Sequence, residues 1–215
     1  NMITELFQLY RQRKDFFLEL LLQHIKIALI VGIIAGIIGL LIGVFISQKK
    51  KLAPLIIGII NVIYTIPSIS MLGFLIPFTG IGDKTAIIAL IIYGLLPMVR
   101  NTYTGINGID DSIIEAAKAM GSTSFQILYK IKLPLAFPVI LSGFRNMIVM
   151  TISISSISSF IGAGGLGVAV YRGITTNNAK MTMAGSLLIA LLALVCDTVI
   201  GRYEKRILKK RRVKQ

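Results

Sequence analysis

The chain has 215 residues, of which 55% are hydrophobic and only 15% charged, whereas soluble domains usually carry roughly 25% charged residues. Its net charge is +14, but the cations gather at the ends of apolar runs, as at Lys49, Lys50 and Lys51. This pattern follows the positive-inside rule for membrane proteins. Composition and charge therefore exclude an ordinary soluble domain and argue against a nucleic-acid-binding protein.

Residues 1–24 form a separate N-terminal segment, too polar for a cleavable signal peptide or a membrane crossing. Leu6, Leu9, Phe16 and Phe17 recur at helical spacing, which predicts an amphipathic helix over residues 2–23 lying along the outer membrane interface. His24, the sole histidine, is interpreted as an interface residue, because one imidazole makes no metal site. We therefore expect no metal in this chain.

Residues 25–202 are predicted to form one transmembrane domain, because an apolar run of about 20 residues spans a bilayer as a helix. Gly32 and Gly36 in the first run allow close helix packing. A Ser- and Gly-rich stretch, 153–170, prolongs the fourth run. The five predicted spans are residues 25–46, 52–77, 85–103, 135–152 and 181–200. The fold class is thus an all-α membrane protein with about five spans.

The basic clusters also predict the orientation of the spans. We place the lysine cluster (Lys49, Lys50 and Lys51) and the basic tail 203–215 in the cytoplasm. By parity, the loop 104–134 is then cytoplasmic, whereas the N-terminus and residues 171–180 lie outside.

Several residues inside the spans are candidates for a translocation pathway. Pro67 in the second span should kink the helix and free a backbone carbonyl, which is tolerated where the backbone is buried in protein or lines a cavity. The same region holds Tyr64, Ser68 and Met71. The other candidates are Met147 in the fourth span and Gly162, Gly164 and Gly165 beyond it. Packing alone is the alternative explanation for each of them.

Two further features of the spans have competing explanations. Gly162, Gly164 and Gly167 match the spacing of a dinucleotide fingerprint, but the required strand and downstream acid are missing, so we reject that function. Placing the charged side chain of Arg145 at membrane depth, in the fourth span, costs considerable free energy. We favour a structural hydrogen-bonding role for it, with Asp197 as a partner only if the side chains snorkel.

The cytoplasmic loop 104–134 is predicted to contain two short helices around a glycine turn. Ser112 and Glu115 have capping-box spacing at the start of the first helix, and Gly121 can end it. Ser122 or Ser124 would cap the second helix, 125–131, which Pro134 would stop. Small residues at Ala116 and Ala117 would let another protein approach closely, so the loop suits docking.

The same loop carries a specific resemblance. Glu115, Ala116, Ala117 and Gly121, followed at fixed spacing by Ile131, Leu133 and Pro134, resemble the EAA motif. That motif is typical of the permease subunits of binding-protein-dependent ABC importers, and motif and spans together cover nearly the whole chain. The resemblance implies that this loop, with Ser112 at its start, is the coupling helix that docks on a cytoplasmic ATPase subunit.

The resemblance also implies a location, partners and a substrate class. The chain would lie in the bacterial cell membrane with a second permease copy or paralogue, two ATP-binding subunits carrying ATP and Mg²⁺, and an extracytoplasmic binding protein or fused domain. The chain itself would hold no cofactor and hydrolyse no ATP. Residues 64–82 and 160–167 resemble osmoprotectant permeases for betaine, choline or carnitine, and a fused relative of this kind imports ergothioneine. Methionine-type permeases share the second segment, so they remain an alternative, ahead of a membrane-embedded lipid enzyme or a passive channel.

Overall fold

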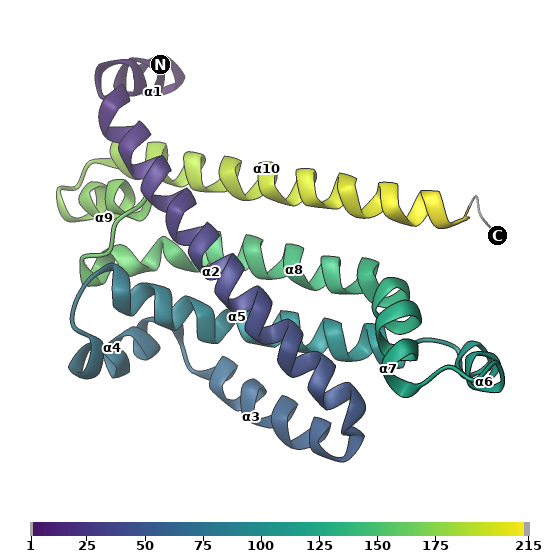
Figure 1. Ribbon diagram of the computed structural model, residues 1–215. Helices are drawn as coiled ribbons and strands as arrows, with labels where there is room; N and C mark the ends of the chain where they lie inside the picture. Colours follow the sequence, from purple (N-terminus) through teal and green to yellow (C-terminus); the bar gives the residue numbers. More distant parts are fainter. Residues whose placement is uncertain (1, 213–215) are drawn as a thin grey trace.

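The protein is a bundle of helices with one long axis, described here by a computed structural model for residues 2–212 (Figure 1). Side chains are described as far as Lys209. The last residues of the predicted basic tail, 213–215, lie outside the described residues. The predicted all-α membrane fold is confirmed: among the described residues, four helices are long and apolar enough to cross a membrane, or five if one bent pair is a single span.

The helices follow one another along the chain with short connections. In the first half they are α1 (Met2–Gln12), α2 (Lys14–Gln48), η1 (Lys50–Leu52), α3 (Ala53–Thr65), α4 (Ser68–Thr79) and α5 (Asp83–Asn107). In the second half they are α6 (Asp111–Ala119), α7 (Ser124–Gln126), η2 (Ile127–Lys132), α8 (Leu133–Ser155), η3 (Ile157–Ile161), α9 (Gly167–Thr175) and α10 (Ala179–Arg212).

Helices α2, α5 and α8 form the main core. Val31 and Ala35 of α2 pack with Leu90 of α5 and with Met147 and Ile152 of α8, all of them at most 1% exposed. Glycines bring α2 and α8 together, as the sequence predicted. A Cβ at Gly32 would lie 2.6 Å from Ile148 Cδ1, and one at Gly36 would lie 3.3 Å from the Phe144 ring. The two helices therefore cross at close range.

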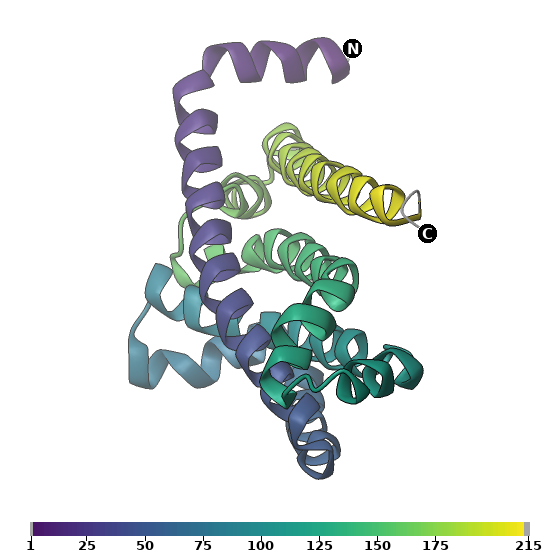
Figure 2. The same ribbon diagram turned by 45° about the vertical axis from the view of Figure 1, so that its right-hand side comes forward.

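The N-terminal segment differs from the prediction in its length. The amphipathic helix α1 ends at Gln12, and the chain turns sharply at Arg13 into α2 (Figure 2). Residues 14–23 belong to the spanning helix because Phe17 and Leu20 are buried against the α9–α10 region, together with Leu6 of α1. Tertiary packing thus continued the helix beyond the apolar run.

The second predicted span is not a single kinked helix. Helix α3 stops at Thr65 and α4 starts at Ser68, and the pair is bent by 96°, as in a broken span or a re-entrant loop. Pro67 lacks an N–H group and disfavours helical backbone at Ile66, which takes an extended ψ of 127°. Proline chemistry therefore breaks the helix completely here, where we had expected a kink.

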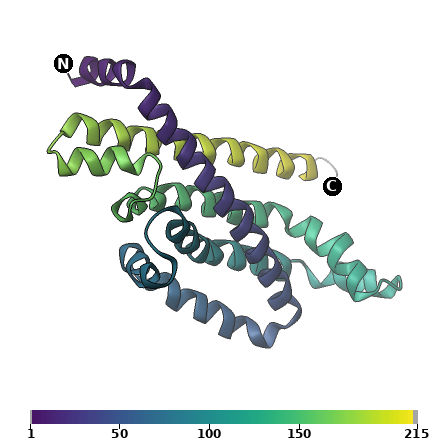
Figure 3. The ribbon, with the colours of Figure 1, turned by 60° about the vertical axis from the view of Figure 1, so that its left-hand side comes forward.

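The elements separate into two ends of the molecule. Helices α1 and α9 and the loop between α4 and α5 lie at one end, with α9 alongside the start of α10 (Figure 3). The end of α2, helices α6 and α7 and the C-terminal end of α10 lie at the other (Figure 1). This arrangement puts all the segments predicted to be cytoplasmic at the same end.

Candidate functional site

The first candidate site is the helix pair formed by α6 and α7 at the predicted cytoplasmic end. Asp110, not Ser112, caps α6: its Oδ1 accepts a hydrogen bond from the Ser112 backbone N–H at 2.8 Å. Hydrogen bonding from Ser112 lowers the pKa of the Asp110 carboxyl. The predicted capping box of Ser112 and Glu115 is therefore wrong, because the preceding aspartate satisfies the free N–H first, and Glu115 stays exposed.

Gly121 ends α6 as predicted, and its φ is +81°. The Gly121 N–H donates to the Lys118 carbonyl at 2.9 Å, and the Ser122 N–H donates to the Ala117 carbonyl at 3.0 Å. These two bonds are the Schellman pattern, which requires a left-handed residue that glycine supplies best. The turn fixes the direction in which the chain leaves α6.

The second short helix is capped by Thr123, not by Ser122 or Ser124. Its hydroxyl accepts from the Gln126 N–H, and the Gln126 side chain accepts from the Thr123 N–H at 2.8 Å. The predicted stop at Pro134 is also wrong: α7 continues through a π-helical turn, η2, into α8. The proline follows the wide π turn, which gives its ring room that a regular α-helical turn lacks.

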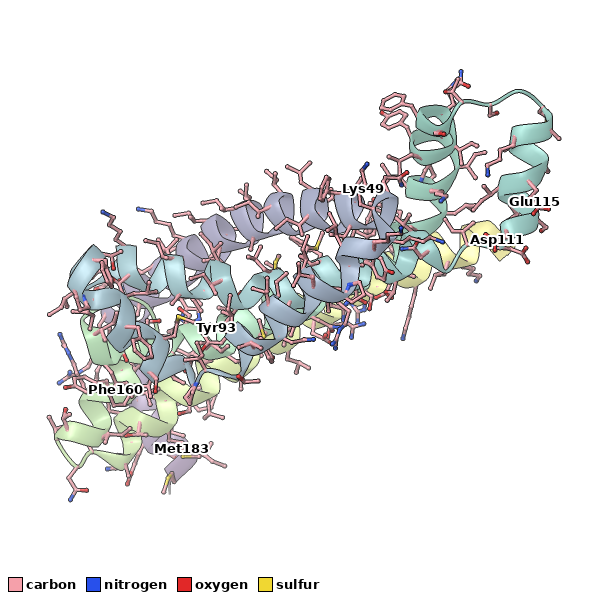
Figure 4. The ribbon with its side chains drawn as sticks, turned by 90° about the horizontal axis from the view of Figure 1, so that it is seen from below. Lys49, Tyr93, Asp111, Glu115, Phe160 and Met183 are labelled. Atoms are coloured by element: carbon pink, nitrogen blue, oxygen red, sulfur yellow. The ribbon has the colours of Figure 1, made fainter. Side chains whose placement is uncertain are left out.

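The helix pair presents apolar side chains that sequence reasoning did not single out. Met120, Phe125 and Tyr129 are 86%, 74% and 66% exposed, and the two rings stack with centroids 6.4 Å apart. Ala117 and Ile127 are buried and hold the pair together, whereas Ala116 is exposed. Figure 4 shows Asp111 and Glu115 on α6, standing away from the main bundle. The signal was present in the sequence as large apolar residues in an otherwise polar loop.

The remaining motif positions lead into the bundle. Ile131 and Leu133 are half-buried, and Leu133 packs against the main core. Pro134 lies in the first turn of α8. The motif therefore runs from an exposed helix to the start of a spanning helix.

The second candidate site is the break between α3 and α4. The Tyr64 hydroxyl donates to Met150 Sδ at 3.3 Å, and its ring meets the edge of Tyr93 with centroids 5.9 Å apart. The Tyr93 hydroxyl donates to the Ile66 carbonyl, which the break has freed. Met71 is buried beside Tyr93. Sequence analysis did not place Tyr93 or Met150 at this site, because they lie on other helices, α5 and α8.

The structure does not bring all the predicted pathway residues to this break. Pro67 and the half-buried Ser68 are at the start of α4, as expected from their position. Met147, however, is 0% exposed in the main core, with its side chain next to Gly36 and Gly94. It packs between α2, α5 and α8, apart from the cluster around Met71.

The third candidate site is the glycine loop, residues 162–167, at the opposite end from α6. Three successive backbone N–H groups of this loop donate to side chains of other helices: Gly164 to Asp83 Oδ1 at 2.7 Å, Gly165 to Gln23 Oε1 at 3.1 Å, and Leu166 to His24 Nδ1 at 3.2 Å. We call these three hydrogen bonds the clasp. Gly162 and Gly165 have φ of +74° and +97°, which explains why glycine occupies these positions.

His24 is therefore not the interface residue that the sequence indicated. It is 0% exposed, and its Nε2 lies 3.1 Å from the Ile152 carbonyl. Because Nδ1 accepts a hydrogen bond from Leu166, the ring hydrogen must be on Nε2, which donates to Ile152. The imidazole thus joins α2, α8 and the glycine loop in one contact.

The intramembrane charge has the predicted structural role. Arg145 makes a two-pronged contact with Asp197, with Nε to Oδ1 at 2.6 Å and Nη2 to Oδ2 at 2.7 Å. Its Nη1 also reaches Glu204 at 3.4 Å. The pair joins α8 to α10 directly, so the snorkelling that we expected is unnecessary. Both acids lie on the partner helix, where sequence separation hid their proximity.

A family described as "Binding-protein-dependent transport system inner membrane component" matches residues 21–213, nearly the whole chain. The chain belongs to this family. It is accordingly a transport component of the inner membrane, and the predicted resemblance to importer permeases is confirmed.

Relatives of this permease carry osmoprotectant names. It is 38% identical over 204 residues to the carnitine transport permease protein OpuCD of Listeria monocytogenes, covering 94% of this chain and 92% of the relative. It is 38% identical to the choline transport system permease protein OpuBB of Bacillus subtilis, covering 86% and 85% of the two chains. A third relative is the ergothioneine transport permease/ergothioneine binding protein EgtU of Helicobacter pylori, at 36% identity, covering 75% of this chain but 29% of that protein.

Solved structures share the fold of the permease. A structure of inward-facing conformations of the MetNI methionine ABC transporter matches with a TM-score of 0.79 and 26% identity, covering 86% of this chain and 93% of that one. An amino acid ABC transporter crystallised with histidines matches with a TM-score of 0.78 at 20% identity, which shows the fold alone. The bundle is therefore the fold of ABC importer permeases.

Proposed function

We propose that this chain is the membrane-spanning subunit of an ABC importer for a small osmoprotectant, a quaternary amine such as betaine, choline or carnitine. One observation carries the proposal: identity of 35–38% to permeases named for those compounds, over most of both chains. Ergothioneine is the variant that the EgtU relative supports.

The helix pair at the cytoplasmic end is proposed to receive force from an ATP-binding subunit. Ser112, Glu115 and Ala116 are exposed on α6, and the apolar Met120 and Phe125 are exposed on the same helix pair. Two copies of the ATP-binding subunit would bind ATP and Mg²⁺, and each would hold one such pair. Because α7 is continuous with α8, displacement of the pair would tilt a spanning helix without an intervening joint.

Substrate is proposed to pass beside the break between α3 and α4. Tyr64 is 41% exposed there, and an aromatic face attracts a quaternary amine without needing a hydrogen bond from it. One exposed tyrosine, packed against the buried Tyr93, provides a weak site in a chain without tryptophan, which suits a pathway that must release its cargo. Tight recognition is assigned to the extracytoplasmic binding protein or fused domain.

An amino-acid importer of the methionine type is the second candidate, favoured by the fold match at a TM-score of 0.79. The deciding experiment is uptake by the reconstituted complex, consisting of the permease, its ATPase and its binding protein in proteoliposomes. We expect ATP-dependent accumulation of a labelled betaine, choline or carnitine, and none of methionine. Accumulation of methionine alone would transfer the proposal to the second candidate.

The orientation can be tested independently of substrate. After Cys196 is replaced by Ala, single cysteines at Lys50 and Lys118 should react with an impermeant maleimide only from the cytoplasmic side. A cysteine at Asn177 or Thr4 should react only from outside. A cytoplasmic Thr4 would place α1 on the wrong side of the membrane.

A further inference from the structure

A cavity of about 520 Å³ at the predicted cytoplasmic end is lined by side chains from two distant segments. Lys49, Lys50 and Lys51 come from the end of α2 and from η1, and Lys132 comes from the end of η2. Figure 4 shows Lys49 at this end, near the helix pair that carries Asp111. Four cations therefore converge from segments that are far apart in the sequence.

The charges in this cavity are largely uncompensated. Among the described residues, no salt bridge involves any of the four lysines. Repulsion from Lys50 and Lys118 acts on Lys132, and attraction from Asp111 offsets only part of it. A cavity with this balance of charge favours an anion.

An apolar groove of about 410 Å³ lies between α2 and α8, on the side of the cavity that faces the predicted membrane interior. Ile33, Ile37 and Leu40 of α2 form one wall, and Phe137 and Leu141 of α8 form the other. Leu40 and Ser47, which lines the cationic cavity, are two helical turns apart and so share a face of α2. The groove and the cavity are thus aligned along α2.

The dimensions match one leaflet of a bilayer. From Ile33 to Ser47, α2 rises by about 21 Å at 1.5 Å per residue. Half of the hydrocarbon core measures about 15 Å, so the groove and the cavity together are long enough to extend from the headgroup level to the bilayer centre. An occupant of the two sites together must have an anionic head and an apolar tail.

We propose that this groove and cavity bind one anionic phospholipid of the cytoplasmic leaflet, with the phosphate at Lys50 and Lys132 and an acyl chain against Phe137. The leaflet follows from the predicted orientation of the permease. A lipid held there would bridge α2 to the start of α8, the helix that continues from the coupling motif. Lipid charge would then influence how the helix pair is positioned.

The test exploits the lack of tryptophan in this chain. Phe137→Trp places a fluorophore in the groove wall, and Phe45→Trp is the matched control, because Phe45 is 52% exposed on α2, lines neither site and lies near the same end. Each variant is reconstituted, within the complex with its ATPase, in vesicles of phosphatidylcholine containing brominated phosphatidylglycerol or brominated phosphatidylcholine. The signal of the unsubstituted complex is subtracted.

We expect brominated phosphatidylglycerol to quench the Phe137→Trp variant at roughly one twenty-fifth of the mole fraction needed for brominated phosphatidylcholine, since each of the two lysines at the headgroup changes affinity by roughly fivefold. The Phe45→Trp control should be quenched equally by both lipids. Adding Lys50→Gln and Lys132→Gln should abolish the preference in the groove variant, whereas Arg202→Gln and Lys205→Gln, outside the cavity, should leave it intact.

Three results would overturn the proposal. One is equal quenching of the Phe137→Trp variant by both lipids. Another is loss of the preference on addition of inorganic phosphate at constant ionic strength, which would make the cavity a free-anion site. The third is crosslinking of Lys50 or Lys132 to the ATPase in most complexes, which would make the cavity part of that interface. Uptake of substrate enters none of these readouts, so the proposed function and this site can fail separately.

Discussion

Gly121 offers a test of the helix pair in which backbone strain can be separated from packing. Its φ is +81°, and a Cβ built on it meets no atom within 4 Å. Gly121→Ala therefore adds no clash and costs roughly 1–2 kcal/mol through the left-handed backbone alone. If the strain is relieved by moving the pair, the docking geometry should become about five- to thirtyfold less populated, because 1.4 kcal/mol is a factor of ten.

The assay is the affinity of the ATPase subunit for the permease in nanodiscs, together with substrate-stimulated ATP hydrolysis. We expect Gly121→Ala to weaken binding by about tenfold and Gly121→Val at least as much, while Gly121→Asn retains more affinity, since asparagine tolerates this backbone. Membrane insertion should not change. Gly58→Ala is the control, because Gly58 also has open space around it but lies in a helix without positive φ. Wild-type affinity in both Gly121→Ala and Gly121→Val would refute the argument.

Three further predictions concern contacts between helices. Arg145→Gln and Asp197→Asn should each lower the free energy of unfolding, and the double variant by less than their sum, as a double-mutant cycle in detergent would show; additive losses would contradict the pairing. His24→Ala should lower the free energy of unfolding by about 1–3 kcal/mol, because buried backbone groups lose their hydrogen-bond partners. A loss of stability no larger than that caused by replacing an exposed leucine of α2 with alanine would contradict this. The hydrogen bond to Lys180 lowers the pKa of Glu5, so the contact stabilises the position of α1 fully at pH values above 4.5 and is lost as the pH falls through the lowered pKa. Proteolysis between α1 and α2 should therefore increase only in that acid range. The increase on acidification should be smaller in Glu5→Gln, which lacks the contact at every pH.

Hydropathy and local motifs predicted the spans and the helix pair, because those signals lie within a few residues of one another. The positive φ of Gly121 follows from its neighbours in the motif. The clasp could not be predicted, because His24, Asp83 and Leu166 are far apart in sequence and their contact depends on how helices cross. Caps were misassigned for a different reason: Asp110 and Thr123 are also good cap residues, and each begins its helix one or two residues from a serine that the sequence offered instead.

At Pro67 the sequence correctly predicted a disturbed helix but not the full break between α3 and α4. A freed backbone carbonyl was anticipated, but neither its position at Ile66 nor its partner, the hydroxyl of Tyr93 on the next helix, was. With that hydrogen bond available, a full bend costs less than a gentle kink that would leave the carbonyl unpaired. Hydropathy averaged over the whole run could not distinguish a bent pair from a straight span.

Helix α2 also connects the two ends of the molecule as a single rigid element. It runs without interruption for 35 residues, about 52 Å, and carries the clasp residues Gln23 and His24 toward one end and the lysine cluster at the other. A rotation of about 10° about its midpoint would carry each end through about 4.5 Å and His24, about 10 Å from the midpoint, through about 2 Å. That is enough to stretch a hydrogen bond of the clasp beyond its normal length. The clasp and the packing of α2 against α5 and α8 therefore both oppose a change of tilt, and because the helix is unbroken, any tilt that displaces one end displaces the other as well.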